Sequence, residues 1–341
     1  MTDKPLILSC PLPRSLPLIF TPERLAELHA RYRIVETTDD ALADLPDGTL
    51  SEVRHIIGQP PLLAETLARL TSLRCIFNVE SNLLNNMPYD LVFQRGIHVL
   101  TTGAVFAEPV AEIGLGFALN LLRSIHSADA DFSLGREKWG GDGNGQARLL
   151  TGAQVGIIGF GDLGRALARV LTGFRPGLRV HDPWLPASRI VDAGATPCDL
   201  PTLLAASEVI FVTAAVTSEN RAFLGADAFA AMRPGTAFIL LSRADVVDFP
   251  ALMEAVASGH IVAATDVWPE EPLAPDHPAR RLPGLLKSAH RAGALDVAFK
   301  RMGDMVLEDM ALIDRGLPPL VCRRAERETV SRMRSKPVVV N

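Results

Sequence analysis

The sequence predicts an α/β fold in which two domains each contain a doubly wound parallel sheet. The chain has 341 residues, enough for two buried cores at roughly 100–200 residues per domain. Short apolar β-type runs alternate with helix-like stretches along most of its length, which is the pattern of parallel α/β units. Near the middle of the chain, one strand-to-helix connection is rich in glycine, which permits the tight turns of such sheets.

Composition excludes several classes of protein. Hydrophobic residues make up 48% of the chain and charged residues 21%, a composition that folds rather than stays disordered. The formal net charge of −5 argues against nucleic acid as the main partner. The 4 cysteines are far apart and form no C-x-x-C pair, which predicts reduced thiols and no metal site. Without a signal-type segment or a long uncharged apolar run, we expect a cytoplasmic protein that does not enter a membrane.

The first hundred residues predict the first sheet. Its expected strands are residues 5–9, 53–57, 74–78 and 98–100, with helix-like stretches at 21–31 and 62–70. Residues 108–125 then form a helix that is apolar almost all round, with Pro109 in its first turn and Glu112 and Arg123 as its main charges. We expect this helix to be buried in something larger than its own domain. Repeated glycines make residues 135–145 a loop.

The second sheet follows this loop. Its expected strands are residues 154–158, 177–181, 209–213, 236–241 and 261–266, separated by helical patterns. A further helix is expected over residues 294–313, and the chain then continues into a basic tail, residues 323–336.

A G-x-G-x-x-G pattern occupies Gly159, Gly161 and Gly164, with a strand before it and a helix after it. Gly159 permits a tight turn, Gly161 lets the backbone approach a pyrophosphate, and Gly164 lets the helix pack on the sheet. The helix N-terminus then offers N–H groups and a partial positive charge to the phosphates. A glycine-rich turn without a ligand is the alternative. The matched context favours a dinucleotide site, whose expected contacts include Asp162 and Leu163.

Asp182, at the end of the following strand, fits the acidic residue that such a site requires. Its carboxylate would accept hydrogen bonds from the adenosine ribose and repel a 2′-phosphate, so NAD is favoured over NADP. Asp162 is discordant, because a carboxylate at the mouth of a phosphate site must point away or be offset by a positive charge.

Three later segments carry a resemblance to a known family. They contain Arg243 in Ser-Arg-Ala, Glu271 in Asp-Val-Trp-Pro-Glu-Glu-Pro-Leu, and His290 shortly before Ala-Gly. In these segments the chain resembles the D-isomer-specific 2-hydroxyacid dehydrogenase family, well over residues 97–304 and loosely before them. Glu271 argues against formate dehydrogenase within that family.

The resemblance implies two Rossmann-like or flavodoxin-like domains, with an NAD-binding domain (residues 105–296) inserted into a substrate domain (residues 1–104 and 297–341). Crossing segments near 102–109 and 293–298 would act as hinges of a cleft. It also implies NAD as cofactor, a small 2-oxo or 2-hydroxy acid as substrate, and a homodimer formed through the helix 108–125.

The family's chemistry explains the residue types. Hydride transfer to a 2-oxo acid leaves an alkoxide that needs a proton, which His290 would supply. Glu271 would bond the far ring nitrogen and fix the tautomer, and Arg243 would bind the substrate carboxylate and carbonyl. By resemblance, Asp266 would contact the nicotinamide carboxamide. Further cofactor contacts are expected at Thr213, Thr217, Ser242 and Gly293.

Each residue has a plainer interpretation when taken alone. His290 could be structural, Glu271 could be a solvated loop carboxylate, and Arg243 could pair with a neighbouring acid, Asp245 or Asp248. Together, their order and spacing match the family and favour catalysis.

The substrate loop departs from the family. Where relatives carry small residues whose backbone N–H groups hold the substrate carboxylate, this chain has residues 78–82, so Glu80, Ser81 and Asn82 are candidate substrate contacts beside Arg243. That change and the basic tail motivate an alternative function, a non-catalytic NAD(H)-sensing binding protein of the corepressor type. The sequence favours the dehydrogenase and does not identify its 2-oxo acid.

Overall fold

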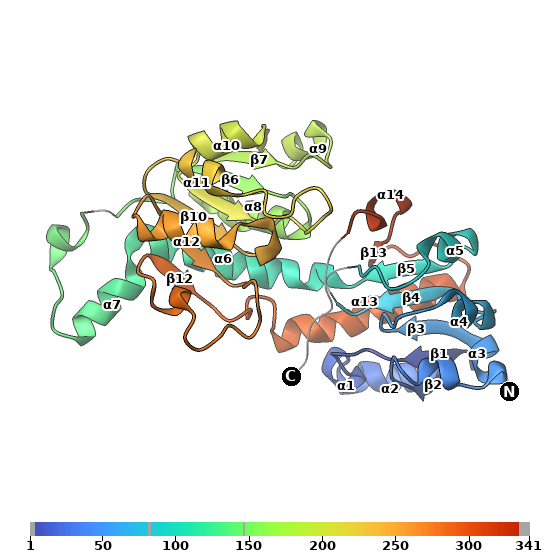
Figure 1. Cartoon of the computed structure of the whole chain (residues 1–341). Helices are drawn as coiled ribbons and strands as arrows, with labels where there is room; N and C mark the ends of the chain where they lie inside the picture. Colours follow the sequence, from blue (N-terminus) through green and yellow to red (C-terminus); the bar gives the residue numbers. More distant parts are fainter. Residues whose placement is uncertain (1–3, 81–82, 146, 334–341) are drawn as a thin grey trace. The chain divides into compact units, whose positions relative to one another are not determined.

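A computed structural model describes residues 4–80, 83–145 and 147–333. These residues divide into two compact units, each described here by itself. Unit 1 contains Met1–Phe106, Thr217–Glu219 and Ala294–Asn341, and unit 2 contains Ala107–Val216 and Asn220–Gly293. Each unit is an α/β structure built on its own sheet (Figure 1).

Unit 1 has a 6-stranded sheet in the order β13-β5-β4-β3-β1-β2. Its strands are β1 (Leu6–Ser9), β2 (Arg33–Glu36), β3 (Val53–Ile57), β4 (Cys75–Asn78), β5 (His98–Thr101) and β13 (Arg323–Arg324). All pairs are parallel except β13 with β5, which is antiparallel. The strand order reverses between β1 and β3. Open α/β sheets bind ligands at the carboxyl ends of their strands near such a reversal.

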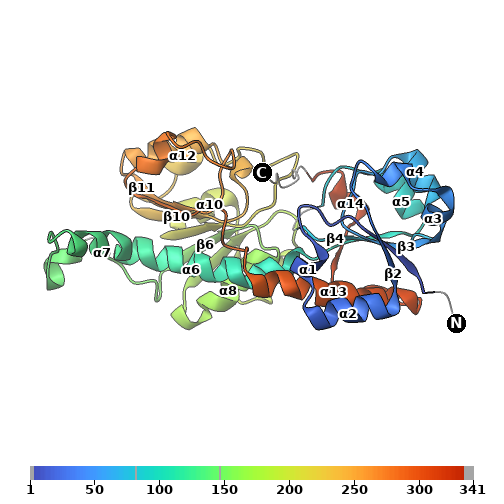
Figure 2. The same cartoon turned by 90° about the horizontal axis from the view of Figure 1, so that it is seen from below.

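Helices cover both faces of this sheet because successive strand residues point to opposite sides. Ile7 packs in one core with Phe77 and Met302, whereas Leu8 packs in the other with Ile56. Figure 2 shows α2 and α13 together along one face. The helices of the unit are α1 (Leu16–Ile19), α2 (Pro22–Arg31), α3 (Asp47–Glu52), α4 (Ala64–Arg69), α5 (Tyr89–Gln94), α13 (Asp296–Asp314) and α14 (Arg327–Val330), with 3₁₀ turns η1 (Leu42–Asp44) and η2 (Gly103–Phe106).

Two aspartates of α13 anchor the C-terminal part of unit 1. Asp309 is fully buried, and its carboxylate accepts main-chain N–H groups from Leu320 and Cys322, both at 2.7 Å. Asp314 accepts the Tyr32 hydroxyl at 2.6 Å and His55 Nε2 at 3.0 Å. The chain leaving α13 is thereby directed to the sheet edge, where β13 pairs with β5.

Unit 2 has a 7-stranded parallel sheet in the order β12-β11-β10-β9-β6-β7-β8. Its strands are β6 (Gln154–Ile158), β7 (Gly177–His181), β8 (Thr196–Pro197), β9 (Val209–Val212), β10 (Thr236–Leu240), β11 (Ile261–Thr265) and β12 (Leu285–Lys287). The central strands β9 and β10 are buried along their whole length, as expected when helices cover both faces. The order reverses between β6 and β9, so their carboxyl ends border the expected ligand crevice.

The helices of unit 2 are α6 (Ala107–Arg123), α7 (Ile125–Ser133), α8 (Asp162–Leu171), α9 (Ala187–Val191), α10 (Leu200–Ala206), α11 (Ala226–Ala230) and α12 (Phe249–Ala257), with 3₁₀ turns η3 (Gly140–Gly143), η4 (Thr172–Phe174), η5 (Ala244–Val246) and η6 (Pro278–Arg281). Within the described residues, one helical stretch, Gly103–Arg123, is long and apolar enough to cross a membrane. Its apolar window is 50% buried inside the protein. At Gly114 of α6, an added Cβ would lie 2.7 Å from Leu241 Cδ1, so the apolar surface of this helix serves close packing on the sheet.

The helix expected over residues 108–125 ends earlier, because Ser124 takes a left-handed backbone conformation (φ 52°) and a separate helix, α7, begins. None of the residues of α7 is buried, and Figure 1 shows α7 extending beyond the sheet of its unit. We call α7 and the described part of the loop after it, residues 125–145 and 147–149, the apolar arm. Its exposed large apolar residues are Ile125, Phe132, Leu134, Trp139 and Leu149.

Candidate active site

The glycine turn between β6 and α8 has the backbone that its sequence predicts. Gly159 has φ 87°, and a Cβ there would lie 2.5 Å from the main chain of Ala214. A Cβ at Gly164 would lie 2.4 Å from the carbonyl oxygen of Gly159. At Gly161, by contrast, no described atom lies within 4 Å of an added Cβ. Packing therefore requires glycine at the first and third positions, whereas the second borders open space at the N-terminus of α8.

Asp182 connects this turn to the end of β7. One carboxylate oxygen accepts the main-chain N–H of Phe160 at 2.7 Å, and the other accepts that of Trp184 at 2.9 Å. Because each oxygen retains acceptor capacity, the half-buried carboxylate can also receive ribose hydroxyls. The discordant Asp162 is offset by Arg165, whose guanidinium lies 3.3 Å from its carboxylate. Leu163 follows Asp162 as the second residue of α8.

Two hydroxyl side chains line the ends of the neighbouring strands. Thr213 Oγ1 donates to the carbonyl oxygen of Gly159 at 2.6 Å, which fixes the turn against β9. Ser242 is buried, and its Oγ has no hydrogen-bond partner among the described residues. A buried hydroxyl without a partner costs free energy, so this atom suits a polar ligand. The open Gly161, the Asp182 carboxylate and Ser242 together fit a bound dinucleotide.

His290 and Glu271 form a direct pair, although they are far apart in sequence. Glu271 Oε2 lies 2.5 Å from His290 Nδ1, and Glu271 Oε1 accepts the main-chain N–H of Trp268 at 2.9 Å. Burial raises the pKa of Glu271, but hydrogen bonds from His290 and Trp268 and the positive charges of His290 and Arg243 outweigh it and hold this pKa below its ordinary value. The carboxylate is therefore ionised, and Nδ1 is the ring nitrogen that it engages. Proton exchange with a ligand is left to Nε2.

Asp266 fixes the loop that carries His290. Its side chain is buried, and its two carboxylate oxygens accept the main-chain N–H groups of Arg291 at 2.9 Å and Ala292 at 3.0 Å. Its carbonyl oxygen accepts the N–H of His290 at 2.7 Å. These bonds hold His290 in the left-handed region (φ 51°), which non-glycine residues seldom adopt. Sequence reasoning missed this positioning role, because the spacing alone does not reveal which backbone the carboxylate binds.

Arg243 lies in extended backbone (φ −148°) directly after Ser242, which itself follows β10 and Leu241. Its Nη1 donates to the carbonyl oxygen of Ser242 at 2.7 Å, and the side chain is half-buried. The structure thus brings Arg243, Glu271 and His290 to the carboxyl end of the sheet of unit 2, on the loops after β10, β11 and β12. Opposite charges and an imidazole held at one sheet edge can bind an anion and move a proton.

Some expected site residues belong to unit 1 or to its boundary. Thr217 forms an antiparallel bridge with Met333 and groups with unit 1. Glu80 is also in unit 1, whereas Ser81 and Asn82 lie outside the described residues. Gly293 is the last residue of unit 2.

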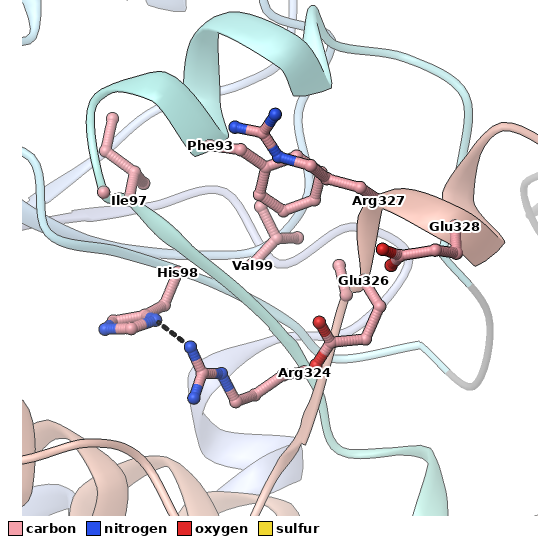
Figure 3. Close-up of a pocket in the computed structure, with 10 residues that line it drawn as sticks. Phe93, Ile97, His98, Val99, Arg324, Glu326, Arg327 and Glu328 are labelled. Atoms are coloured by element: carbon pink, nitrogen blue, oxygen red, sulfur yellow. Dashed lines mark hydrogen bonds between the residues drawn. The ribbon is translucent and has the colours of Figure 1, made fainter.

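Unit 1 also contains a groove of about 270 Å³ between α5, β5 and the C-terminal segment (Figure 3). His98 Nδ1 lies 3.4 Å from Arg324 Nη2, and the Arg327 guanidinium lies 5.6 Å from the centroid of the Phe93 ring. Glu326 and Glu328 line the same groove, so both signs of charge are present. None of the residues predicted for catalysis or cofactor binding lines it. Among the residues that the structure describes, no three His, Cys, Asp or Glu side chains are grouped to hold a metal.

Comparison with protein families identifies the family of the chain. The family described as D-isomer specific 2-hydroxyacid dehydrogenase, NAD binding domain, matches residues 115–292. The chain belongs to the D-isomer specific 2-hydroxyacid dehydrogenase family. In this 2-hydroxyacid dehydrogenase family member, the segment that matches the NAD-binding domain lies within unit 2 except for Thr217–Glu219, and NAD is the cofactor.

Relatives of this family member include enzymes with several names. It is 30% identical to a D-3-phosphoglycerate dehydrogenase of Archaeoglobus fulgidus over 69% of this chain and 44% of the relative, so it spans less than half the length of that protein. It is 30% identical to a glyoxylate reductase of Thermofilum pendens over 68% of this chain and 69% of the relative. A solved structure described as a phosphoglycerate oxidoreductase from Rhizobium etli is 65% identical to this chain. The match covers 96% of this chain and 100% of the solved chain, with a TM-score of 0.88.

Proposed function

We propose that the chain is an NAD-dependent enzyme that interconverts a D-2-hydroxy acid and the corresponding 2-oxo acid. The observation that carries the proposal is the 2.5 Å contact between His290 Nδ1 and Glu271, on the same sheet edge as Arg243. An acid-base pair and a guanidinium beside an NAD site are the groups that this reaction needs. Family membership supports the same reaction class.

The three side chains have separate tasks. Arg243 binds the substrate carboxylate and polarises the carbonyl with its planar set of donors. His290 gives a proton from Nε2 to the substrate oxygen during reduction and takes it back during oxidation. Glu271 orients the imidazole and stabilises its protonated form through Nδ1. Asp266 holds the loop in the backbone conformation that presents the ring.

When bound, NAD supplies the hydride acceptor, and NADH the hydride donor. The residues that we propose to hold it are those of the glycine turn together with Asp182, Thr213, Thr217, Ser242, Asp266 and Gly293. The helix N-terminus after Gly161 suits the pyrophosphate. The Asp182 carboxylate suits the ribose and disfavours a 2′-phosphate.

We further propose that residues 1–104 and 297–341 form the substrate domain, with Glu80, Ser81 and Asn82 in its substrate loop, and residues 105–296 the inserted NAD-binding domain. A homodimer and a cytoplasmic location are part of the proposal. The exposed side chains of the apolar arm support the homodimer, because large apolar side chains are costly to leave in water. The corepressor-type binding function gains no support from the relatives. The basic tail that motivated it supplies β13 and α14 to unit 1, and its Ala325 and Val330 pack in the core.

Steady-state kinetics with NADH and a panel of 2-oxo acids test the proposal. We expect turnover of at least one acid by the native chain, and a loss of about 10²–10⁴-fold in kcat for His290→Ala with NADH binding retained. Absence of turnover with every acid, by a folded chain that binds NADH, would contradict the proposed function.

A further inference from the structure

Arg14 and Glu80 form an ion pair at the carboxyl edge of the sheet of unit 1. Arg14 lies in the loop after β1, and Glu80 is two residues beyond the end of β4. Arg14 Nε lies 3.3 Å from Glu80 Oε1, and the two side chains are only 20% and 13% exposed. The carboxyl edge near the β1/β3 reversal is where a doubly wound sheet binds small ligands.

Both partners are held in place by the surrounding chain. The Glu80 main-chain N–H donates to Asn78 Oδ1 at 2.7 Å, and its carbonyl oxygen accepts Thr101 Oγ1 at 2.9 Å. The Arg14 guanidinium lies 4.7 Å from the centroid of the Phe299 ring, a cation-π contact with α13. The main-chain N–H of Glu80 is thus already bonded to Asn78. The group that Glu80 offers to a ligand is therefore its carboxylate side chain. The pair is preorganised.

Stability gives little reason for such a pair. Removing two charges from water costs free energy that their attraction seldom exceeds, and apolar residues of similar size often stabilise as well or better. A preorganised pair at a ligand-binding edge is better explained by recognition, because fixed donors and acceptors discriminate between substrates.

The charges of the pair indicate what it recognises. Its net charge is zero, so it does not supply the positive potential that a substrate phosphate needs, and Glu80 would repel that phosphate. A methyl group would cover both charged groups without pairing with either. A hydroxyl can donate to the carboxylate and accept from the guanidinium at the same time.

We propose that Arg14 and Glu80 are specificity-determining residues that select 2-oxo acids with a hydroxyl on C3 over those with a methyl or a phosphate there. The assignment rests on the proposed function, since it concerns the substrate of that reaction. The proposed substrate class is therefore the 2-oxo acids that carry a hydroxyl group on C3.

The experiment compares kcat/KM with NADH for three acids that differ only at C3: pyruvate, hydroxypyruvate and the 3-phosphate ester of hydroxypyruvate. We expect the native chain to prefer hydroxypyruvate by at least about tenfold over each of the others. Glu80→Gln removes the carboxylate charge with little change of shape. This variant should lower kcat/KM for hydroxypyruvate and raise kcat/KM for the phosphate ester, so that the native preference between these two acids is lost or reversed. The kcat/KM for pyruvate should change less than about threefold.

Two further variants separate recognition from structure. Arg14→Lys keeps the positive charge but loses the planar donors and the stacking on Phe299, so part of the preference should remain. Asp304→Asn breaks another ion pair of unit 1, to Arg24 Nε at 2.7 Å, and should leave all three ratios unchanged. Thermal unfolding of each variant checks that it is folded.

The outcomes are distinguishable. Turnover with a native preference for the methyl or phosphate acid, or ratios unchanged in Glu80→Gln, would overturn the assignment of Arg14 and Glu80 and leave the proposed function standing. Failure of the folded, NADH-binding native chain to turn over any of the three acids or the wider panel would overturn the proposed function and this assignment with it.

Discussion

The main-chain N–H of His290 donates to the carbonyl oxygen of Asp266 at 2.7 Å, and the Asp266 carboxylate receives the next two N–H groups of the same loop. An aspartate at the end of one strand thereby holds the imidazole-bearing loop at the end of the next. His290 remains in a left-handed conformation because this set of bonds holds it there.

Asp266→Asn tests this relationship. The amide retains one acceptor oxygen and places an NH₂ group against a backbone N–H, leaving a buried donor unsatisfied. We expect a loss of about 1–3 kcal/mol in the free energy of unfolding and a fall in kcat of about tenfold or more. Denaturant titration and steady-state kinetics measure the two effects, and an unchanged kcat would show that the loop does not depend on Asp266.

Glu271 predicts a pH dependence of stability. Its pKa is lowered in the folded protein, so its stabilising contribution is present above the ordinary value of 4.5 and is lost as pH falls through the lower folded value. The native chain should therefore exceed Glu271→Gln in stability at neutral pH, and the difference should shrink below pH 4.5. Urea midpoints measured across acidic pH test this, and a constant difference would be inconsistent with it.

Alanine substitutions at two glycines of the turn should affect two different properties of the protein. Gly161→Ala places a methyl group where no described atom lies within 4 Å, so folding should be unaffected while the Kd for NADH rises about tenfold or more. Gly164→Ala places its methyl 2.4 Å from a carbonyl oxygen, so it should destabilise the protein by about 1–3 kcal/mol. Thermal unfolding and NADH fluorescence titration separate the two, and equal effects on stability would argue against this description of the turn.

The apolar arm predicts self-association. Phe132 and Trp139 pack edge-to-face at 6.4 Å between ring centroids while their residues are 63% and 76% exposed. Replacing both with Ser should shift a dimer to monomer without affecting the melting of the core, because no residue of α7 is buried in the chain. Sedimentation velocity reports the change, and Leu63→Ser, also exposed but in unit 1, is the matched control. A native chain that sediments as a monomer would exclude the proposed dimer.

The sequence predicted the interior strands of both sheets because strands such as β1, β6 and β10 are largely apolar runs followed by helical patterns. It missed the edge strands, whose short or charged sequences carry little of that signal. β13 consists of two arginines and was expected to be part of a basic tail, yet it pairs with β5. Charged residues suit an edge strand, where one side faces water.

The candidate site, like the fold, was predicted only in part from the sequence. Gly159, Glu271 and His290 were predicted from motifs because their chemistry restricts both residue type and spacing. The role of Asp266 in holding the His290 loop was not predicted, since it depends on carboxylate-to-backbone bonds between loops far apart in sequence. The pairing of Thr217 with Met333 was equally hidden, because a bridge between isolated residues leaves no periodic pattern.

The helix α13 gives the chain an order of assembly during synthesis. Met302 and Met310 of this helix are fully buried against the first sheet, and Asp309 then directs the chain to the sheet's last strand. The first unit therefore lacks part of its own interior until α13 (Asp296–Asp314) has left the ribosome. Unit 2 is almost continuous in sequence, and all its strands precede α13. The nascent chain therefore completes the cofactor-binding unit before unit 1, although strands β1 to β5 of unit 1 are synthesised earlier.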